Sequence, residues 1–93
     1  MSICIRIDAE HPSLAGHFPG NPVVPGVVLL DSVAQALERE DAVTFARIRV
    51  VKFHAPLLPQ QDAEISIERV ETRARFRIDR DGQPILSGEA ELA

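Results

Sequence analysis

The sequence predicts an α+β fold in which a curved antiparallel sheet wraps one central helix. The helix comes from the apolar segment 26–40, which follows a loop rich in proline and glycine. The sheet comes from segments on either side of the helix in which apolar and polar residues alternate, the period of half-buried strands. The predicted helix is apolar on nearly every side, so other elements must cover it. Consecutive antiparallel strands can provide that cover by curving around it.

Five segments are predicted as strands. The first alternates Ile3, Ile5 and Ile7 with polar residues, and the others repeat this period. A slip in the alternation between Val50 and Val51 predicts a β-bulge, and Asp81 followed by Gly82 predicts a tight turn. The predicted strands span residues 2–8, 46–54, 62–70, 72–79 and 85–92.

The segment before the helix is a long, stiff loop. Residues 11–26 contain four prolines and three glycines, so neither a helix nor a strand can persist there. Loops beyond about 12 residues without structure of their own are uncommon in compact domains and are often functional. The loop ends at Pro25, whose fixed φ favours the first turn of a helix.

The size and composition of the chain limit the kinds of protein that it can be. Ninety-three residues predict one domain over residues 1–93, with 45% hydrophobic residues and a net charge of −4. The acidic balance and the lack of Trp and Tyr argue against nucleic-acid binding. No run is long and apolar enough to span a bilayer and no secretory leader is evident, so we expect a cytoplasmic protein. A single Cys4 and scattered histidines predict no disulfide and no metal site.

Asp31 is an unusual residue within the apolar helix, because burying an unpaired carboxylate costs on the order of several kcal/mol. Gln35 lies four residues later on the same side of the helix and could donate a hydrogen bond to it. His17 lies in the preceding loop, so a base and an acid could share one cavity. Simpler interpretations stay open, namely a solvated histidine and an aspartate that only favours the helix dipole.

Two longer sequence motifs resemble segments of a known protein family. Residues 16–35 read GHFPGNPVVPGVVLLDSVAQ, and residues 51–59 read VKFHAPLLP. Both segments resemble the bacterial β-hydroxyacyl-acyl carrier protein dehydratases, which have the hot-dog fold. In that family a carboxylate follows the loop histidine by fourteen residues, and the interval from His17 to Asp31 is the same. The chain-elongation members carry Glu at the position of Asp31, whereas the branch that makes unsaturated decanoyl chains carries Asp.

The resemblance implies dehydration of 3-hydroxyacyl thioesters to trans-2-enoyl thioesters, with His17 and Asp31 as the catalytic pair. His17 would take the α-proton, and Asp31 would assist the departing hydroxyl with Gln35 behind it. Gly26 begins the helix, where a backbone N–H without an intrahelical partner could stabilise the thioester oxygen. The neighbouring residues expected to bind substrate are Phe18, Pro19, Gly20, Val24 and Pro25. No cofactor is expected beyond the phosphopantetheine arm of the substrate.

The expected partners are an acyl carrier protein and a second hot-dog chain. In the family, the histidine and the carboxylate of one site come from opposite subunits, which implies a dimer. A short chain with open sheet edges also favours a homodimer or an oligomer of dimers, with a heterodimer containing a related chain as the alternative. Arg73, Arg75 and Arg77 share one face of the predicted strand 72–79.

These arginines could dock an acidic carrier, or they could be a solvated face balanced by Glu64, Glu68 and Glu71. The next candidates for docking are Arg47, Arg49 and Lys52. Of the remaining histidines, His54 is expected to be structural or exposed and His11 to be a turn residue.

Two other functions stay open, a hot-dog acyl thioesterase and a non-catalytic module that binds acyl chains or carrier proteins. The sequence also leaves open the acyl chain length. It does not distinguish primary fatty-acid synthesis from a specialised polyene or polyketide pathway.

Overall fold

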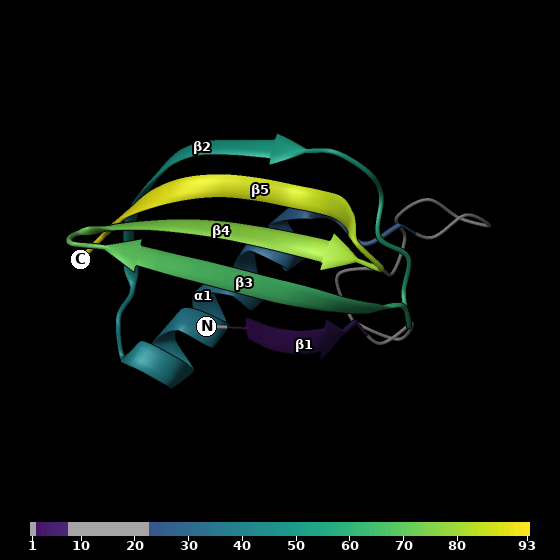
Figure 1. Ribbon diagram of the computed structural model, residues 1–93, viewed down its shortest axis with the longest axis horizontal. Coiled ribbons are helices and arrows are strands. Elements are labelled where there is room, and N and C mark those ends of the chain that lie inside the picture. The colour runs from purple at the N-terminus through teal and green to yellow at the C-terminus, as the bar shows by residue number, and fades with distance from the viewer. Residues whose placement is uncertain (1, 8–22) are drawn as a thin grey trace.

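A computed structural model describes residues 2–7 and 23–93 of the chain. The described elements are one helix and five strands (Figure 1). In chain order they are β1 (Ser2–Arg6), α1 (Gly26–Asp41), β2 (Phe45–Phe53), β3 (Asp62–Val70), β4 (Arg73–Arg80) and β5 (Gln83–Leu92). The predicted helix and all five predicted strands are confirmed, and most of their ends agree within two residues.

The strands form one antiparallel sheet with the order β1-β3-β4-β5-β2. In Figure 1 the sheet lies across the helix, with α1 behind the strands. The two edges of the sheet are therefore β1 and β2, which flank the helix in the sequence. This arrangement is the α+β hot-dog fold that the sequence predicted.

The alternation along the strands decides which side chains face the helix. In β4, Ala74, Phe76 and Ile78 are buried, whereas the residues between them are exposed. The buried residues of α1 meet this inner face of the sheet in one hydrophobic cluster. The helical members of the cluster are Val28, Leu29, Val33, Ala36 and Leu37. Burying one such side chain stabilises the fold by about 1.5–3 kcal/mol.

The turn between β4 and β5 has the predicted form. Asp81 and Gly82 have φ values of 50° and 80°, and this pair of positive values is typical of a two-residue hairpin turn. The turn aligns Asp79 with Pro84 and so fixes which residues of β4 and β5 lie opposite each other.

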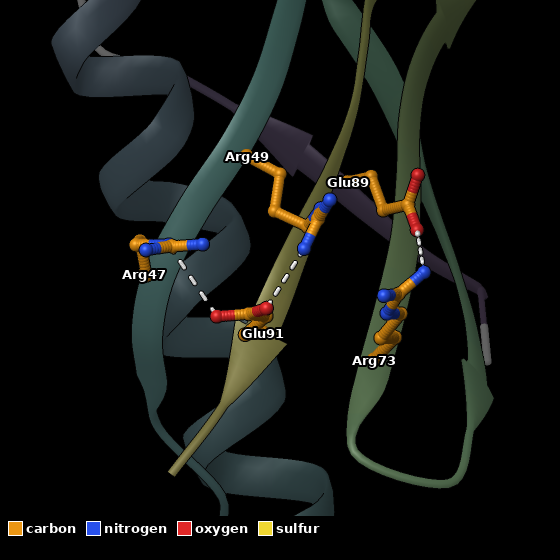
Figure 2. Close-up of polar contacts among 5 residues, drawn as sticks. All are labelled: Arg47, Arg49, Arg73, Glu89 and Glu91. Carbon is orange, nitrogen blue, oxygen red and sulfur yellow. Dashed lines mark hydrogen bonds and ion pairs between the residues drawn. The ribbon is translucent and has the colours of Figure 1, made fainter.

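Strand β2 is irregular at two points. Its register against β5 shifts between Phe45 and Arg47 and again between Ile48 and Val50. The sequence placed a bulge slightly later, at Val50 and Val51, because the alternation alone did not reveal the extra residue Arg49. The second irregularity leaves Arg49 without an opposite residue and directs its side chain to the same carboxylate as Arg47 (Figure 2). Bulges of this kind are common on edge strands.

The prediction that α1 is buried on every side is wrong for the single chain. The sheet covers one flank, and the opposite flank is open: Val27 is 72% exposed, and Asp31 and Gln35 are also exposed. The reason is geometric, because five strands curve around only one side of the helix. The apolar residues on the open flank predict an additional covering element rather than a complete core within one chain.

Candidate active site

The N-terminus of α1 offers free backbone donors. Pro25 is the N-cap and has no side chain that can bond to the first turn. Its carbonyl accepts hydrogen bonds from the N–H groups of Val28 at 3.0 Å and Leu29 at 3.3 Å. The N–H groups of Gly26 and Val27 have no backbone acceptor among the described residues. These two donors lie at the positive end of the helix dipole, where they favour an oxygen that gains negative charge.

Phe53 lies directly against Gly26. A Cβ atom added at Gly26 would lie 2.5 Å from Cε1 and 2.6 Å from Cζ of the Phe53 ring. Such distances are far below van der Waals contact, so a glycine is needed for this approach. The end of β2 and the start of α1 therefore form one wall, although they are separated by more than twenty residues in the sequence.

A pocket of about 410 Å³ opens at this wall. Val24 and Pro25, which the sequence analysis expected to contact substrate, both line it. The complete lining is Val23, Val24, Pro25, Gly26, Leu29, Phe53, His54, Ala55, Pro56 and Leu57. A mostly apolar pocket beside free N–H donors suits a thioester with an apolar chain.

Asp31 and Gln35 form the contact that their spacing predicted. The Gln35 side-chain amide Nε2 donates to Asp31 Oδ2 at 2.7 Å. Both residues lie on the open flank of α1, so the aspartate is not enclosed by apolar residues of its own chain as the sequence suggested. The hydrogen bond fixes one carboxylate oxygen and leaves Oδ1 for another partner.

Four of the predicted site residues, His17, Phe18, Pro19 and Gly20, lie outside the described residues. The pairing of His17 with Asp31 therefore stays a prediction. Gly26, Val24 and Pro25 are brought together at the pocket, and Asp31 lies five residues further along the same helix. At a rise of about 1.5 Å per residue, this separation is about 7.5 Å along the helix axis.

His54 is exposed, as the sequence suggested, but it also lines the pocket beside Gly26. Its Nε2 atom lies 2.8 Å from the Ser87 hydroxyl. Neither His54 nor Phe53 was among the predicted site residues. The motif at 51–59 was the available signal for both residues, because it resembles a family segment just as the GHFPG loop does.

The three predicted docking arginines lie on the outer face of the sheet, the face turned away from α1. Two of them have carboxylate partners. Arg77 Nε lies 2.8 Å from Asp79 Oδ2, and Arg73 Nη1 lies 3.7 Å from Glu89 Oε1. Arg75 has no ion pair among the described residues.

No group of three or more His, Cys, Asp or Glu side chains in residues 2–7 and 23–93 is placed to hold a metal ion. Over the same residues, no helix has the length and hydropathy needed to cross a membrane.

The curved sheet around one helix, with a pocket at the helix N-terminus, defines a hot-dog domain. The profile of the ApeI-like family, described as ApeI dehydratase, matches residues 1–89. The chain belongs to this family.

Three solved structures share the fold. One is a chain of the dehydratase heterocomplex ApeI:P from Xenorhabdus doucetiae, with a TM-score of 0.87 and 30% identity over 99% of this chain and 85% of that chain. An uncharacterized protein from Erwinia carotovora subsp. atroseptica gives a TM-score of 0.79 and 25% identity, covering 99% of this chain and 81% of that one. A point mutant of the fluoroacetyl-CoA-specific thioesterase FlK shares the fold alone, with a TM-score of 0.68 and 15% identity over 100% of this chain and 86% of that chain.

Curated relatives include 3-hydroxyacyl-[acyl-carrier-protein] dehydratases named FabZ. The one from Haemophilus influenzae (strain PittEE) is 32% identical over 78 residues, covering 73% of this chain and 53% of the relative. The chain thus spans about half the length of that relative. The one from Ruminiclostridium cellulolyticum is 31% identical over 102 residues, covering 95% of this chain and 72% of the relative.

Proposed function

We propose that this protein dehydrates 3-hydroxyacyl thioesters to trans-2-enoyl thioesters. The observation that carries the proposal is the arrangement on α1. Asp31 is held by Gln35 on the open flank. On the same helix, the first two N–H groups have no backbone acceptor among the described residues and lie beside an apolar pocket. Membership of a dehydratase family supports the same reaction.

The reaction places three demands on the site. A weakly acidic α-proton must leave, the thioester oxygen must carry negative charge, and the 3-hydroxyl must depart as water. We assign the α-proton to His17 as base. The Gly26 N–H donates to the thioester oxygen while the charge develops. Asp31, directly or through a water, delivers the proton that the departing hydroxyl needs as the C3–O bond breaks.

Gln35 is a positioning residue in this scheme. Its amide N–H holds Asp31 Oδ2 at 2.7 Å, which restricts rotation of the carboxylate. The free Oδ1 can then face the hydroxyl of the substrate or a bridging water. A fixed orientation matters because general acid catalysis requires the acid within about 2.6–3.2 Å of the oxygen it protonates.

The site is proposed to be completed by a second hot-dog chain. Strand β2 is an edge of the sheet, and two of its apolar side chains are exposed, Phe53 to 59% and Ile48 to 41%. Val27 on the adjacent helix is exposed as well. An edge strand and an apolar flank together are suited to pairing with another copy. We propose a homodimer; a related chain is the alternative partner, since the similar chain from X. doucetiae is part of a dehydratase heterocomplex.

The substrate is proposed to arrive on an acyl carrier protein. The curated relatives carry that carrier in their names, and the phosphopantetheine arm of the carrier supplies the thioester. The site then needs no further cofactor. We propose that the enoyl product enters fatty-acid, polyene or polyketide synthesis, the pathways that the sequence resemblance implied.

A single assay tests the reaction. The protein is incubated with a 3-hydroxyoctanoyl thioester, and the absorbance of the conjugated enoyl thioester and the release of free thiol are measured in parallel. Enoyl formation without free thiol is expected. Free thiol without enoyl product would instead indicate a thioesterase, and neither product would indicate a binding module.

A further inference from the structure

The outer face of the sheet alternates its charge from strand to strand. Strands β3 and β5 contribute acidic side chains, and β4 and β2 contribute basic ones, so that each basic strand borders an acidic one. The acidic residues are Glu64, Glu68, Glu89 and Glu91, and the basic residues are Arg47, Arg49, Lys52, Arg73, Arg75 and Arg77. Alternation of this kind normally leads to cross-strand ion pairs.

At one end of the face the charges are paired. Arg47 Nε lies 3.4 Å and Arg49 Nη1 lies 2.8 Å from the Glu91 carboxylate (Figure 2). Arg73 contacts Glu89 at 3.7 Å in the same region. This paired end comprises Arg47, Arg49, Arg73, Glu89 and Glu91, and each of its three arginines contacts a carboxylate.

At the other end two of the cations, Lys52 and Arg77, face small hydroxyl residues. Lys52 lies opposite Ser87, and Arg77 lies between Ser87 and Ser66 in the register of the sheet. Serine cannot neutralise a cation. Arg75 lies opposite Glu68 on β3 and Glu89 on β5 in register. Neither Lys52 nor Arg75 has a carboxylate within ion-pair distance among the described residues.

This end of the face is hollowed into a trough of about 570 Å³. Its lining includes three cations, Lys52, Arg75 and Arg77, which define the basic trough. It also includes two carboxylates, but Glu89 is already engaged by Arg73. Since Arg77 is paired with Asp79, the charge available to a partner comes mainly from Lys52 and Arg75.

The basic trough adjoins the candidate active site. Ser87 lines the trough and contacts His54, and His54 lines the apolar pocket beside Gly26. Lys52 immediately precedes Phe53, whose ring lies against Gly26. A molecule bound in the trough therefore lies next to the pocket, around the end of β2.

We propose that the basic trough docks the acidic carrier protein that brings the acyl thioester. This inference rests on the proposed function and adds the surface that the carrier contacts. Carboxylates on the carrier would act as counter-ions for Lys52 and Arg75, neither of which lies within ion-pair distance of a carboxylate among the described residues. The proposal uses Lys52 in place of Arg73, one of the arginines that the sequence suggested, because Arg73 lies 3.7 Å from Glu89 at the paired end.

The test compares two double variants that remove the same charge from the same two strands. Lys52→Gln with Arg75→Gln alters the basic trough, and Arg47→Gln with Arg73→Gln alters the paired end. Each is assayed with 3-hydroxyoctanoyl-carrier and with the same acyl group on N-acetylcysteamine. The trough variant should show about a tenfold higher KM for the carrier-linked substrate at low ionic strength, with less effect at high salt.

The paired-end variant should have the same KM as the wild type for both substrates. The trough variant should have the same KM as the wild type for the small thioester. Equal KM values for the two double variants on carrier-linked substrate would overturn the docking proposal. Fluorescence anisotropy with labelled holo carrier protein measures docking independently of turnover. If the wild type binds the carrier more tightly than the trough variant but forms no enoyl product, the proposed function is refuted and the docking proposal stands. Equal affinities of all three proteins would refute the docking.

Discussion

The two flanks of α1 differ in what covers them. On one flank, Val33 and Leu37 are completely buried against the sheet. On the other, Val27, Asp31 and Gln35 are exposed, and a hydrogen bond joins the two polar side chains. The first flank stabilises the fold of a single chain. The second contributes little to that core, so its residues can be selected for chemistry and for contact with a partner.

The largest expected effect comes from removing the acid on the open flank. Asp31→Asn keeps the shape of the side chain but cannot deliver a proton, so turnover should fall by about 10²- to 10⁴-fold. The melting temperature should stay unchanged because Asp31 is exposed. Glu38→Gln, an exposed change on the same helix, is the matched control and should retain full activity. Near wild-type dehydration by Asp31→Asn would remove this residue from the mechanism.

The covered flank should respond in the opposite way. Leu37→Ala creates a cavity in the core and should lower the free energy of unfolding by about 2–5 kcal/mol. Val27→Ala on the open flank should change the free energy of unfolding of the dissociated chain by less than about 0.5 kcal/mol. Urea denaturation at a protein concentration at which the chain is dissociated measures both. Similar losses for the two variants would show that the flanks do not differ in the way described.

A smaller effect is expected where the open flank meets β2. Gly26→Ala places a methyl group where the Phe53 ring lies, and the exposed ring can move away, so the fold should persist. The shifted ring should disturb the pocket and lower kcat/KM by about tenfold. Phe53→Ala should make the protein insensitive to the change at Gly26. Purely additive losses in this double-mutant cycle would contradict the contact.

The weakest effect is expected away from both flanks, at the ion pair between β1 and β3. Arg6 Nε donates to Asp62 Oδ1 at 2.7 Å, and this hydrogen bond, followed by the positive charge, lowers the pKa of Asp62. A lowered pKa stabilises the folded state above the unfolded pKa of about 3.9, and that contribution is lost as the pH falls through the folded pKa. Because both side chains are exposed, the change in stability should be small.

NMR titration of the Asp62 carboxyl carbon measures this shift directly. In Arg6→Gln the pKa of Asp62 should rise toward its ordinary value, and dehydratase activity should not change. An unchanged pKa would show that the ion pair is not populated in solution.

The fold could be predicted because each element depends on local patterns. The alternation in residues 72–79 and the Asp81-Gly82 turn together specify the β4–β5 hairpin, whatever the rest of the chain does. The bulge in β2 was misplaced because the extra residue, Arg49, interrupts the register with β5, and cross-strand register is not visible in one strand. The helix was expected to be buried all round because composition records how apolar a segment is, not how many chains cover it.

The candidate site was predicted in part. The Asp31–Gln35 contact follows from helical spacing, and the free N–H of Gly26 follows from its place at a helix start. The approach of Phe53 to Gly26 depends on tertiary packing between the end of β2 and the start of α1, and spacing alone cannot show it. The same holds for the ion pairs that neutralise Arg47, Arg49 and Arg73, since their partners lie on another strand.

The central claim is that the open flank of one chain forms its site together with a second chain, and mixing inactive variants tests it most directly. His17→Ala and Asp31→Asn are purified separately and allowed to exchange subunits, with native mass spectrometry confirming mixed dimers. If His17 and Asp31 of one site come from different chains, each mixed dimer regains one intact site. Random exchange should then restore about a quarter of wild-type dehydration. No recovery despite mixed dimers would contradict the shared site.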